Sequence, residues 1–172
     1  MTIILDPTNE SLPVGRQLAR RTSAIEGRIA LLDISKPKGN ILLDRLQENF
    51  SERLPSIKFT RFFKPTFSRP APDSLRQEIN KDHHFVIEAL ADWGSCTSCS
   101  LHDTIWFEMQ GTPAVTIASS EFISAAHSQS EALGMRDAKC VFVQHPIQNA
   151  SNEEIRNKAD LIVDEIIRAL TK

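Results

Sequence analysis

The sequence predicts an α/β protein, a three-layer sandwich of the Rossmann or flavodoxin type with a mostly parallel sheet of about five strands. Two observations support this prediction. Apolar runs of strand length alternate along the chain with segments of helical period, which is the order that parallel strands and crossover helices produce. Most of these runs are unbroken, as expected for strands buried on both faces. A chain of 172 residues suits a single core, so we expect one domain over residues 1–172.

The expected strands are runs of apolar and β-branched residues between polar or proline-containing segments. The first, at residues 2–5, is short and has the weakest pattern, and the others occupy residues 28–34, 57–63, 84–90, 114–118 and 139–144. Residues 1–27 otherwise lack a clear period, and we expect this N-terminal segment to wrap the surface. Its basic residues should then form a solvated face: Arg16, Arg20, Arg21 and Arg28.

The expected helices carry apolar residues at spacings of three and four. They occupy residues 40–54, 72–81, 101–110, 122–133 and 152–170. Asn40 and Asn152 are suitable N-caps, and Gly111 follows one of the expected C-termini. The proline-rich residues 64–72 are expected to form an extended loop, a candidate lid. The lysine-containing residues 36–40 are expected to form a solvated loop rather than an anion site.

Charge and hydropathy argue against several classes of partner. Twenty Lys and Arg against 22 Asp and Glu give a formal net charge of -2, which argues against binding to a nucleic-acid backbone. The apolar runs are much shorter than the roughly 20 residues of a membrane-spanning helix, and the N-terminus lacks the basic region of a signal peptide. Three cysteines are too few for a secreted disulfide framework. We therefore expect a cytoplasmic protein with a small-molecule substrate, as a homo-oligomer or with a partner subunit.

The polar residues 91–100 lie between the expected strand 84–90 and the expected helix 101–110, and they contain two of the three cysteines. Ligands of parallel α/β sheets bind at such turns, outside the carboxyl ends of the strands. A thiol at a helix N-terminus faces free N–H groups and the positive end of the helix dipole, which lower its pKa below the free value of about 8.5. The pattern therefore predicts that Cys96 is a reactive thiolate.

Cys99 follows Cys96 at the spacing of a CxxC motif. In this arrangement Cys96 would attack a substrate, and Cys99 would resolve the mixed disulfide. A metal held by both sulfurs is an alternative, although the sequence has no second CxxC or His pair to complete a zinc site. A third interpretation treats both thiols as inert core residues. Cys140 falls in an expected strand and is assigned to the core.

Other polar side chains near this turn complete the predicted site. His102 lies three residues after Cys99 and is a candidate catalytic residue that holds a proton or pairs with a thiolate. His145 follows the last expected strand and therefore lies at the same edge of the sheet. Asp103 is either a substrate ligand or a helix cap. The predicted substrate-binding residues are Asp92, Trp93, Ser95, Thr97, Asp103 and His145.

The stretch Ala91-Asp92-Trp93-Gly94-Ser95-Cys96, followed by Thr97-Ser98-Cys99-Ser100-Leu101-His102-Asp103, resembles the UGSC-motif family, whose name spells selenocysteine or cysteine, glycine, serine and cysteine. The resemblance implies thiol or selenol chemistry in a small Rossmann-like domain. Trp93 stands at the family's selenocysteine or first-cysteine position, so only Cys96 of the usual pair is kept. Weaker matches extend along most of the chain: Asp6-Pro7-Thr8, Leu31-Leu32-Asp33, Lys36-Pro37, Gly111-Thr112-Pro113 and His145-Pro146.

These observations leave three functions open. The leading hypothesis is a cysteine-dependent small-molecule enzyme in which Cys96 and Cys99 carry out thiol–disulfide or related reductive chemistry. The second is a lyase or hydrolase with Cys96 as the only nucleophile and His102 or His145 as the base. The third is a non-catalytic binding subunit. No cofactor is predicted, because the sequence has no GxGxxG or phosphate-binding loop, and a metal on Cys96 and Cys99 is the less favoured option.

Overall fold

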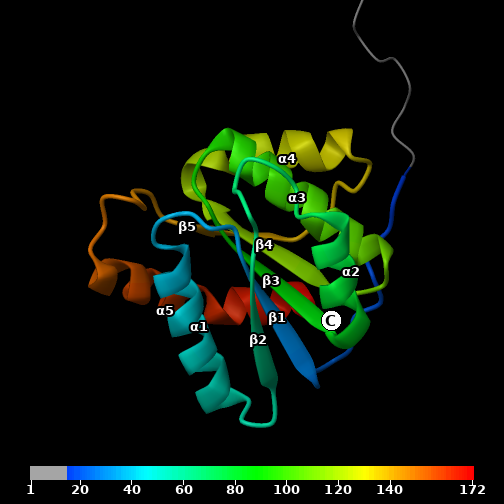
Figure 1. Cartoon of the computed structure of the whole chain (residues 1–172), viewed down its shortest axis with the longest axis horizontal. Coiled ribbons are helices and arrows are strands. Elements are labelled where there is room, and N and C mark those ends of the chain that lie inside the picture. The colour runs from blue at the N-terminus through cyan, green and yellow to red at the C-terminus, as the bar shows by residue number, and fades with distance from the viewer. Residues whose placement is uncertain (1–14) are drawn as a thin grey trace, which may run out of the picture.

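The computed structural model describes residues 15–172, which form five strands and five helices with one short 3-10 turn. The strands lie in one parallel sheet of order β2-β1-β3-β4-β5 (Figure 1). This is the strand order of the flavodoxin-like fold, and it confirms the predicted fold class. The strands are β1 (Arg28–Asp33), β2 (Lys58–Phe63), β3 (Phe85–Ala91), β4 (Ala114–Ser119) and β5 (Cys140–Val143). The expected strand at residues 2–5 lies outside the described residues.

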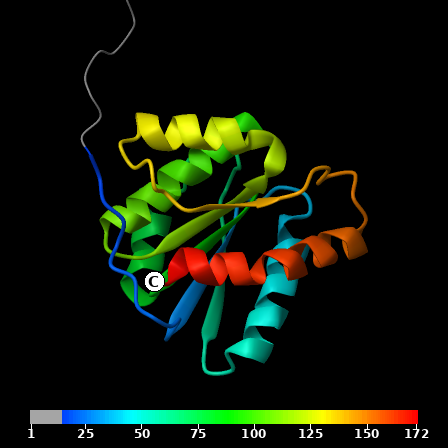
Figure 2. The ribbon, with the colours of Figure 1, turned by 180° about the vertical axis from the view of Figure 1, so that it is seen from behind.

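Helices cover both faces of the sheet, as the unbroken apolar strands require. One face packs against α1 (Gly39–Arg53) and α5 (Asn152–Leu170), which contact each other; α5 lies in front of the strands in Figure 2. The other face packs against α2 (Asp73–Asp82) and α3 (Gly94–Met109), and α4 (Ile123–Ala132) lies against α3 after the 3-10 turn Ser120–Phe122. The two central strands β3 and β4 are buried along their whole length.

Helix starts differ from the predicted ones because caps depend on local backbone geometry. Ser151, rather than Asn152, caps α5: its hydroxyl accepts from the N–H of Glu154, whose side chain accepts from the N–H of Ser151. Helix α1 follows Lys38, which has a left-handed backbone, so Asn40 is not its cap. A Cβ atom at Gly39 would lie 3.3 Å from both Asp33 Oδ1 and Leu90 N, so glycine lets α1 begin close to the ends of β1 and β3.

Residues 15–27 run along the outside of the domain past the C-terminal end of α5 (Figure 2). The N–H of Lys172 donates to the carbonyl of Thr22 at 3.0 Å. Arg21 makes a bidentate ion pair with Glu108 at 2.6 and 2.7 Å, and both side chains are almost fully buried. The prediction that Arg21 belongs to a solvated basic face is therefore wrong, because a buried carboxylate of α3 holds it.

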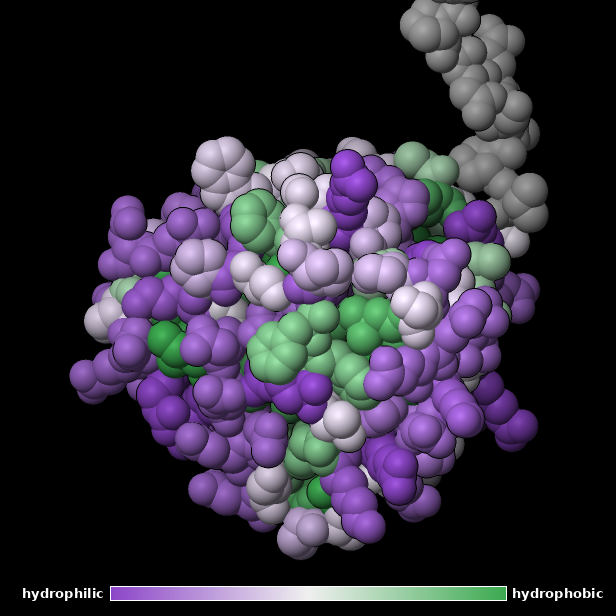
Figure 3. All heavy atoms as spheres, viewed as in Figure 1, coloured by the Kyte–Doolittle hydropathy of each residue, from purple (hydrophilic) through white to green (hydrophobic). Residues whose placement is uncertain are grey.

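The surface seen in Figure 3 is mostly hydrophilic, with a group of apolar side chains near the middle of this face. Among the described residues, no helix is long and apolar enough to cross a membrane. Three of the large apolar side chains that are exposed come from the carboxyl-end half of the sheet or its loops: Phe63, Phe67 and Trp93.

Candidate functional site

Helix α3 begins at Gly94, so Cys96 and Cys99 lie inside its first two turns. The prediction that this helix begins near residue 101 is wrong. The stretch has no apolar period, but its small polar side chains bond to the backbone at the helix start. The Thr97 hydroxyl donates to the carbonyl of Trp93 at 2.8 Å, and the N–H of Trp93 donates to Cys96 Sγ at 3.2 Å. A thiol and a hydroxyl therefore bind the Trp93 backbone at the start of the helix, where Trp93 itself makes no side-chain cap.

Cys96 is completely buried at the N-terminal end of α3. Its thiol lies 3.1 Å from the carbonyl of Trp93 and packs against Ile34, Ala91 and Ala118 at the carboxyl ends of three strands. The sulfur thus meets a backbone N–H group at a helix start, as the sequence predicted, but it does not contact solvent.

Cys99 lies one turn further along α3 and is half-buried. All three cysteines are free thiols. Burial raises the pKa of the Cys99 thiol, while the positive charge of Lys64 acts in the opposite direction. Cys140 is partly buried at the start of β5, where it packs against the residues around Cys96, and burial raises its pKa strongly. Of the two cysteines at the turn, Cys99 is the one that solvent reaches.

A cavity of about 250 Å³ opens beside the start of α3 and is lined by Lys36, Phe67, Trp93, Ser95 and Gln148. We call it the aromatic cavity. Trp93 is 64% exposed, and Phe67 comes from the proline-rich loop. The Lys36 ammonium lies 5.3 Å from the centre of the Phe67 ring and 5.4 Å from that of the Trp93 ring. Two aromatic rings and a fixed cation therefore surround one space.

Asp92 binds the two polar side chains that line the aromatic cavity, Lys36 and Gln148. One of its carboxylate oxygens makes an ion pair with Lys36, and the other accepts from Gln148 Nε2 at 2.8 Å. Lys36 is buried, so the prediction of a solvated loop at residues 36–40 is wrong at this position. A neighbouring hollow of about 190 Å³ is lined in part by Asp92, Trp93 and His145. His145 Nδ1 lies 3.1 Å from the hydroxyl of Ser119, at the end of β4.

The remaining predicted site residues are placed differently. His102 lies on the side of α3 that faces α4, 3.4 Å from the amide of Gln129, and burial lowers its pKa. Thr97 and Asp103 are completely buried. Asp103 is in the middle of α3, so it cannot cap the helix; it accepts from the N–H of Ala71 and forms an ion pair with Lys64. Neither Thr97 nor Asp103 faces the aromatic cavity.

The predicted lid at residues 64–72 is tied at both ends. The carbonyl of Lys64 accepts from the Ser35 hydroxyl at 2.6 Å, and the N–H of Ala71 donates to both Asp103 oxygens at 2.9 Å. Phe67 lies between these two anchors. Sequence reasoning missed Phe67 and Gln148 as cavity residues, since their segments carry no periodic pattern. An aromatic residue in a proline-rich loop is the one signal that could have indicated Phe67.

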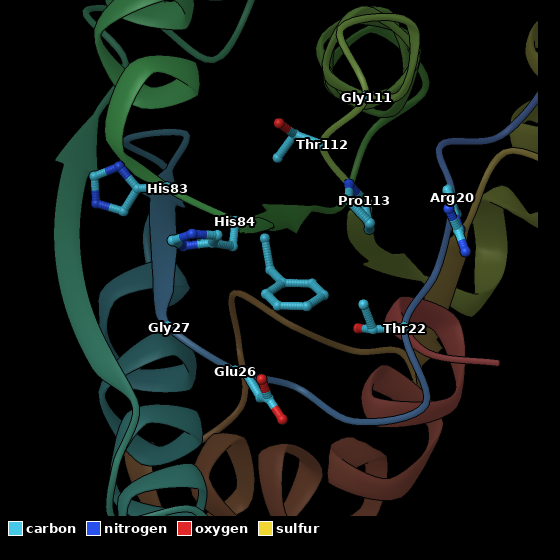
Figure 4. Close-up of a pocket in the computed structure, with 10 residues that line it drawn as sticks. Arg20, Thr22, Glu26, Gly27, His83, His84, Gly111, Thr112 and Pro113 are labelled. Atoms are coloured by element: carbon cyan, nitrogen blue, oxygen red, sulfur yellow. The ribbon is translucent and has the colours of Figure 1, made fainter.

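A larger cavity of about 500 Å³ lies at the opposite, amino-terminal edge of the strands. His83 and His84 lie on one side of it and Arg20 and Thr22 on the other (Figure 4). The His84 ring packs against Gly27, where a Cβ atom would lie 2.7 Å from His84 Nδ1. This cavity contains none of the predicted site residues. Within residues 15–172, no group of three or more His, Cys, Asp or Glu side chains is arranged to hold a metal ion.

Fold and site together define a flavodoxin-like α/β protein with two thiols at the β3–α3 turn. A sequence model described as the UGSC family matches residues 3–172, and the chain belongs to this family. No protein of curated function matches the chain. Among solved structures, the chain is similar to a short-chain flavodoxin associated with a non-canonical PDU bacterial microcompartment, with 9% identity and a TM-score of 0.41. That match covers 82% of this chain and 99% of the other.

Proposed function

We propose that this protein is a small-molecule enzyme that uses the thiols of Cys99 and Cys96. The observation that supports it most directly is the position of the two cysteines. Both are free, they lie three residues apart in the first turns of α3, and they lie at the carboxyl edge where ligands of parallel sheets bind. Residues at this spacing are neighbours on a helix, so one sulfur can approach the other.

Burial supports an order of reaction opposite to the one expected from the sequence. Cys99 is half-exposed and Cys96 is completely buried, so a substrate reaches Cys99 first. Burial raises the pKa of the Cys99 thiol, and Lys64 is the group that acts on it in the direction of the thiolate. Cys96 then acts as the resolving thiol, and the N–H of Trp93 holds its sulfur at 3.2 Å.

The reaction we propose is exchange with a small-molecule disulfide. The Cys99 thiolate attacks one sulfur, a mixed disulfide forms, the substrate S–S bond breaks, and the first substrate thiolate leaves and takes a proton from water. The Cys96 thiol loses its proton and attacks Cys99 Sγ, and the second substrate thiolate leaves. Two electrons pass to the substrate, and a Cys96–Cys99 disulfide remains. A dithiol reductant must then restore the two thiols.

The aromatic cavity supports a small substrate with an apolar, flat group. A volume of about 250 Å³ lies below the roughly 300–1,000 Å³ of pockets that take drug-sized ligands. Phe67 and Trp93 offer ring faces, and Lys36 and Gln148 offer donors. A carbonyl or carboxylate on an aromatic thiol compound fits this combination.

The test is intact-mass and peptide mapping after reaction with an aromatic disulfide. In the wild type we expect a loss of two hydrogens, release of two substrate thiols, and a Cys96–Cys99 link. Cys96→Ser should stop at a mixed disulfide on Cys99, and Cys99→Ser should react at least tenfold more slowly. Cys140→Ser is the matched control and should behave as the wild type, because burial raises the pKa of that thiol.

Two results would contradict the proposal. A stable adduct on Cys99 in the wild type, with no link to Cys96, would show that the two thiols do not act as a pair. Unreactive Cys96 and Cys99 in the folded protein would support a non-catalytic binding subunit.

The Trp93 ring should determine which disulfides react fastest. We expect Trp93→Ala to slow an aryl disulfide about two- to tenfold relative to an alkyl disulfide, since a ring contact contributes about 0.5–1.5 kcal/mol. The measurement is the ratio of the two second-order rate constants. Phe63→Ala is the control, because Phe63 is exposed but does not line the aromatic cavity. Equal slowing of both disulfides by Trp93→Ala would show that the ring does not bind the substrate.

A further inference from the structure

Charged side chains are buried beneath α3, where the proposed reaction does not use them. Lys64 Nζ lies 3.1 Å from Glu88 Oε1 and 2.6 Å from Asp103 Oδ2, and all three side chains are at most 1% exposed. Arg76 reaches the outer side of Asp103 at 3.6 Å. We call Lys64, Glu88 and Asp103 the buried triad. It places two carboxyl groups around one ammonium in a space without solvent.

The two carboxyl groups of the buried triad have different partners. Asp103 accepts from Lys64 and from the N–H of Ala71, which suits an ionised carboxylate. Glu88 accepts only from Lys64. Among the described residues, Glu88 Oε2 has no hydrogen-bond partner, and neither has the Ser100 hydroxyl of α3. A buried polar atom without a partner costs about 1–3 kcal/mol, so these two unpaired atoms need an explanation.

A hydrogen bond between Glu88 Oε2 and the Ser100 hydroxyl would satisfy both unpaired atoms. Two buried carboxyl groups beside one ammonium favour a proton on Glu88, the carboxyl group with fewer donors. An ionised carboxylate only accepts, whereas a protonated one also donates. Ser100 donates to an ionised Glu88, whereas a protonated Oε2 donates to the Ser100 oxygen. Burial raises the pKa of Glu88 to about 8; Asp103 adds to the effect, while Lys64 and the Ser100 hydroxyl oppose it. The carboxyl group is then neutral at physiological pH.

The charge of Glu88 affects the thiol of Cys99, which lies beside the buried triad on α3. Cys99 directly precedes Ser100 and lies one turn before Asp103. The charged and titratable groups that act on its thiol are Lys64, which favours the thiolate, and Asp103, Cys96 and Glu88, which oppose it. With Glu88 neutral, burial, Asp103 and Cys96 are what still oppose the effect of Lys64. With Glu88 ionised, a second negative charge disfavours the Cys99 thiolate.

We propose that Glu88 is a positioning residue of the thiol site: it carries a proton that it donates to Ser100 and, while neutral, adds no negative charge that opposes ionisation of Cys99. Loss of this proton lowers the reactivity of Cys99, so the buried triad limits thiol chemistry at alkaline pH. The link to catalysis rests on the proposed function, but the titration of Glu88 does not.

Glu88→Gln tests this directly, because an uncharged amide of the same shape also donates to Ser100. Iodoacetamide labelling of Cys99, quantified by peptide mass spectrometry between about pH 6 and pH 10, is the measurement. Below pH 8 the variant should match the wild type. Above pH 8 it should react about three- to tenfold faster, because no second negative charge forms. Glu52→Gln, at an exposed position of α1, is the matched control and should follow the wild type throughout. Identical profiles for Glu88→Gln and the wild type would overturn the proposal.

Infrared spectroscopy of the folded protein gives a second measurement. The wild type at neutral pH should show a protonated-carboxyl band that Glu88→Gln lacks, and Ser100→Ala should shift this band by removing its acceptor. Absence of the band overturns the assignment of a proton to Glu88. If the band and the labelling difference are found but no Cys96–Cys99 disulfide forms, the proposed function fails while the assignment of Glu88 stands.

Discussion

Replacing Lys64 with Met should destabilise the protein by about 3–5 kcal/mol near pH 8, one of the largest effects of any single substitution. Lys64 is completely buried and is the one cation between Glu88 and Asp103. Burial opposes its charge, but the two carboxyl groups raise its pKa, so Lys64 stays charged across the physiological range. Removing one partner of a buried ion pair leaves uncompensated charge, which costs about 3–5 kcal/mol.

The deficit of Lys64→Met should shrink as the pH falls. The folded-state pKa of Glu88, already raised to about 8 by burial, rises further without the ammonium that opposes this effect. The folded variant then binds more protons than the unfolded one, so its stability increases toward acid pH. Urea unfolding at several pH values measures this. Lys58→Met, at the exposed start of β2, is the control and should change stability by less than about 0.5 kcal/mol. A deficit that does not change with pH would contradict the account.

Replacing Glu108 with Gln should be similarly costly, for a different reason. Its carboxylate is fully buried and accepts from both Arg21 amino groups at 2.6 and 2.7 Å and from the N–H groups of Ala19 and Ala114 at 2.7 and 2.8 Å. An amide replaces one acceptor oxygen with a donor, so one Arg21 amino group and one backbone N–H lose their partner, and Arg21 loses the opposite charge. We expect a loss of about 3–5 kcal/mol.

The same substitution should release residues 15–27 from the domain. Arg21 and Ala19 both bind the side chain of Glu108, and these contacts hold the segment to α3. Limited trypsin digestion should therefore cleave after Arg20 and Arg21 faster in Glu108→Gln than in the wild type. Glu121→Gln, an exposed position in the 3-10 turn, is the matched control. Unchanged cleavage in Glu108→Gln would mean that other contacts hold the segment.

The strands could be predicted closely because their signal is local. Unbroken apolar runs become buried parallel strands, and each of the five described strands lies within about one or two residues of its predicted position. The start of α3 could not be predicted in the same way. Its first two turns contain small polar residues and cysteines with no apolar stripe. The side chains of Cys96 and Thr97 find hydrogen-bond partners in the Trp93 backbone only once the turn has formed.

Some residues of the candidate site could be predicted from the sequence, and others could not. The carboxyl-edge position of Asp92, Trp93 and Cys96 follows from the alternation of strands and helices. Phe67, Lys36 and Gln148 come from three separate loops, and their meeting depends on how those loops fold over the sheet edge.

The sequence by itself determined the fold class, the family and the presence of a thiol pair at one sheet edge, because these depend on periodicity and on residues adjacent in the chain. Only the tertiary structure decided which thiol solvent reaches, which lysines are buried, and where two carboxyl groups share one ammonium. Burial and charge at a residue depend on atoms brought from distant parts of the chain. The energy of a buried charge depends on the atoms around it, and the order of residues along the chain does not show which atoms these are.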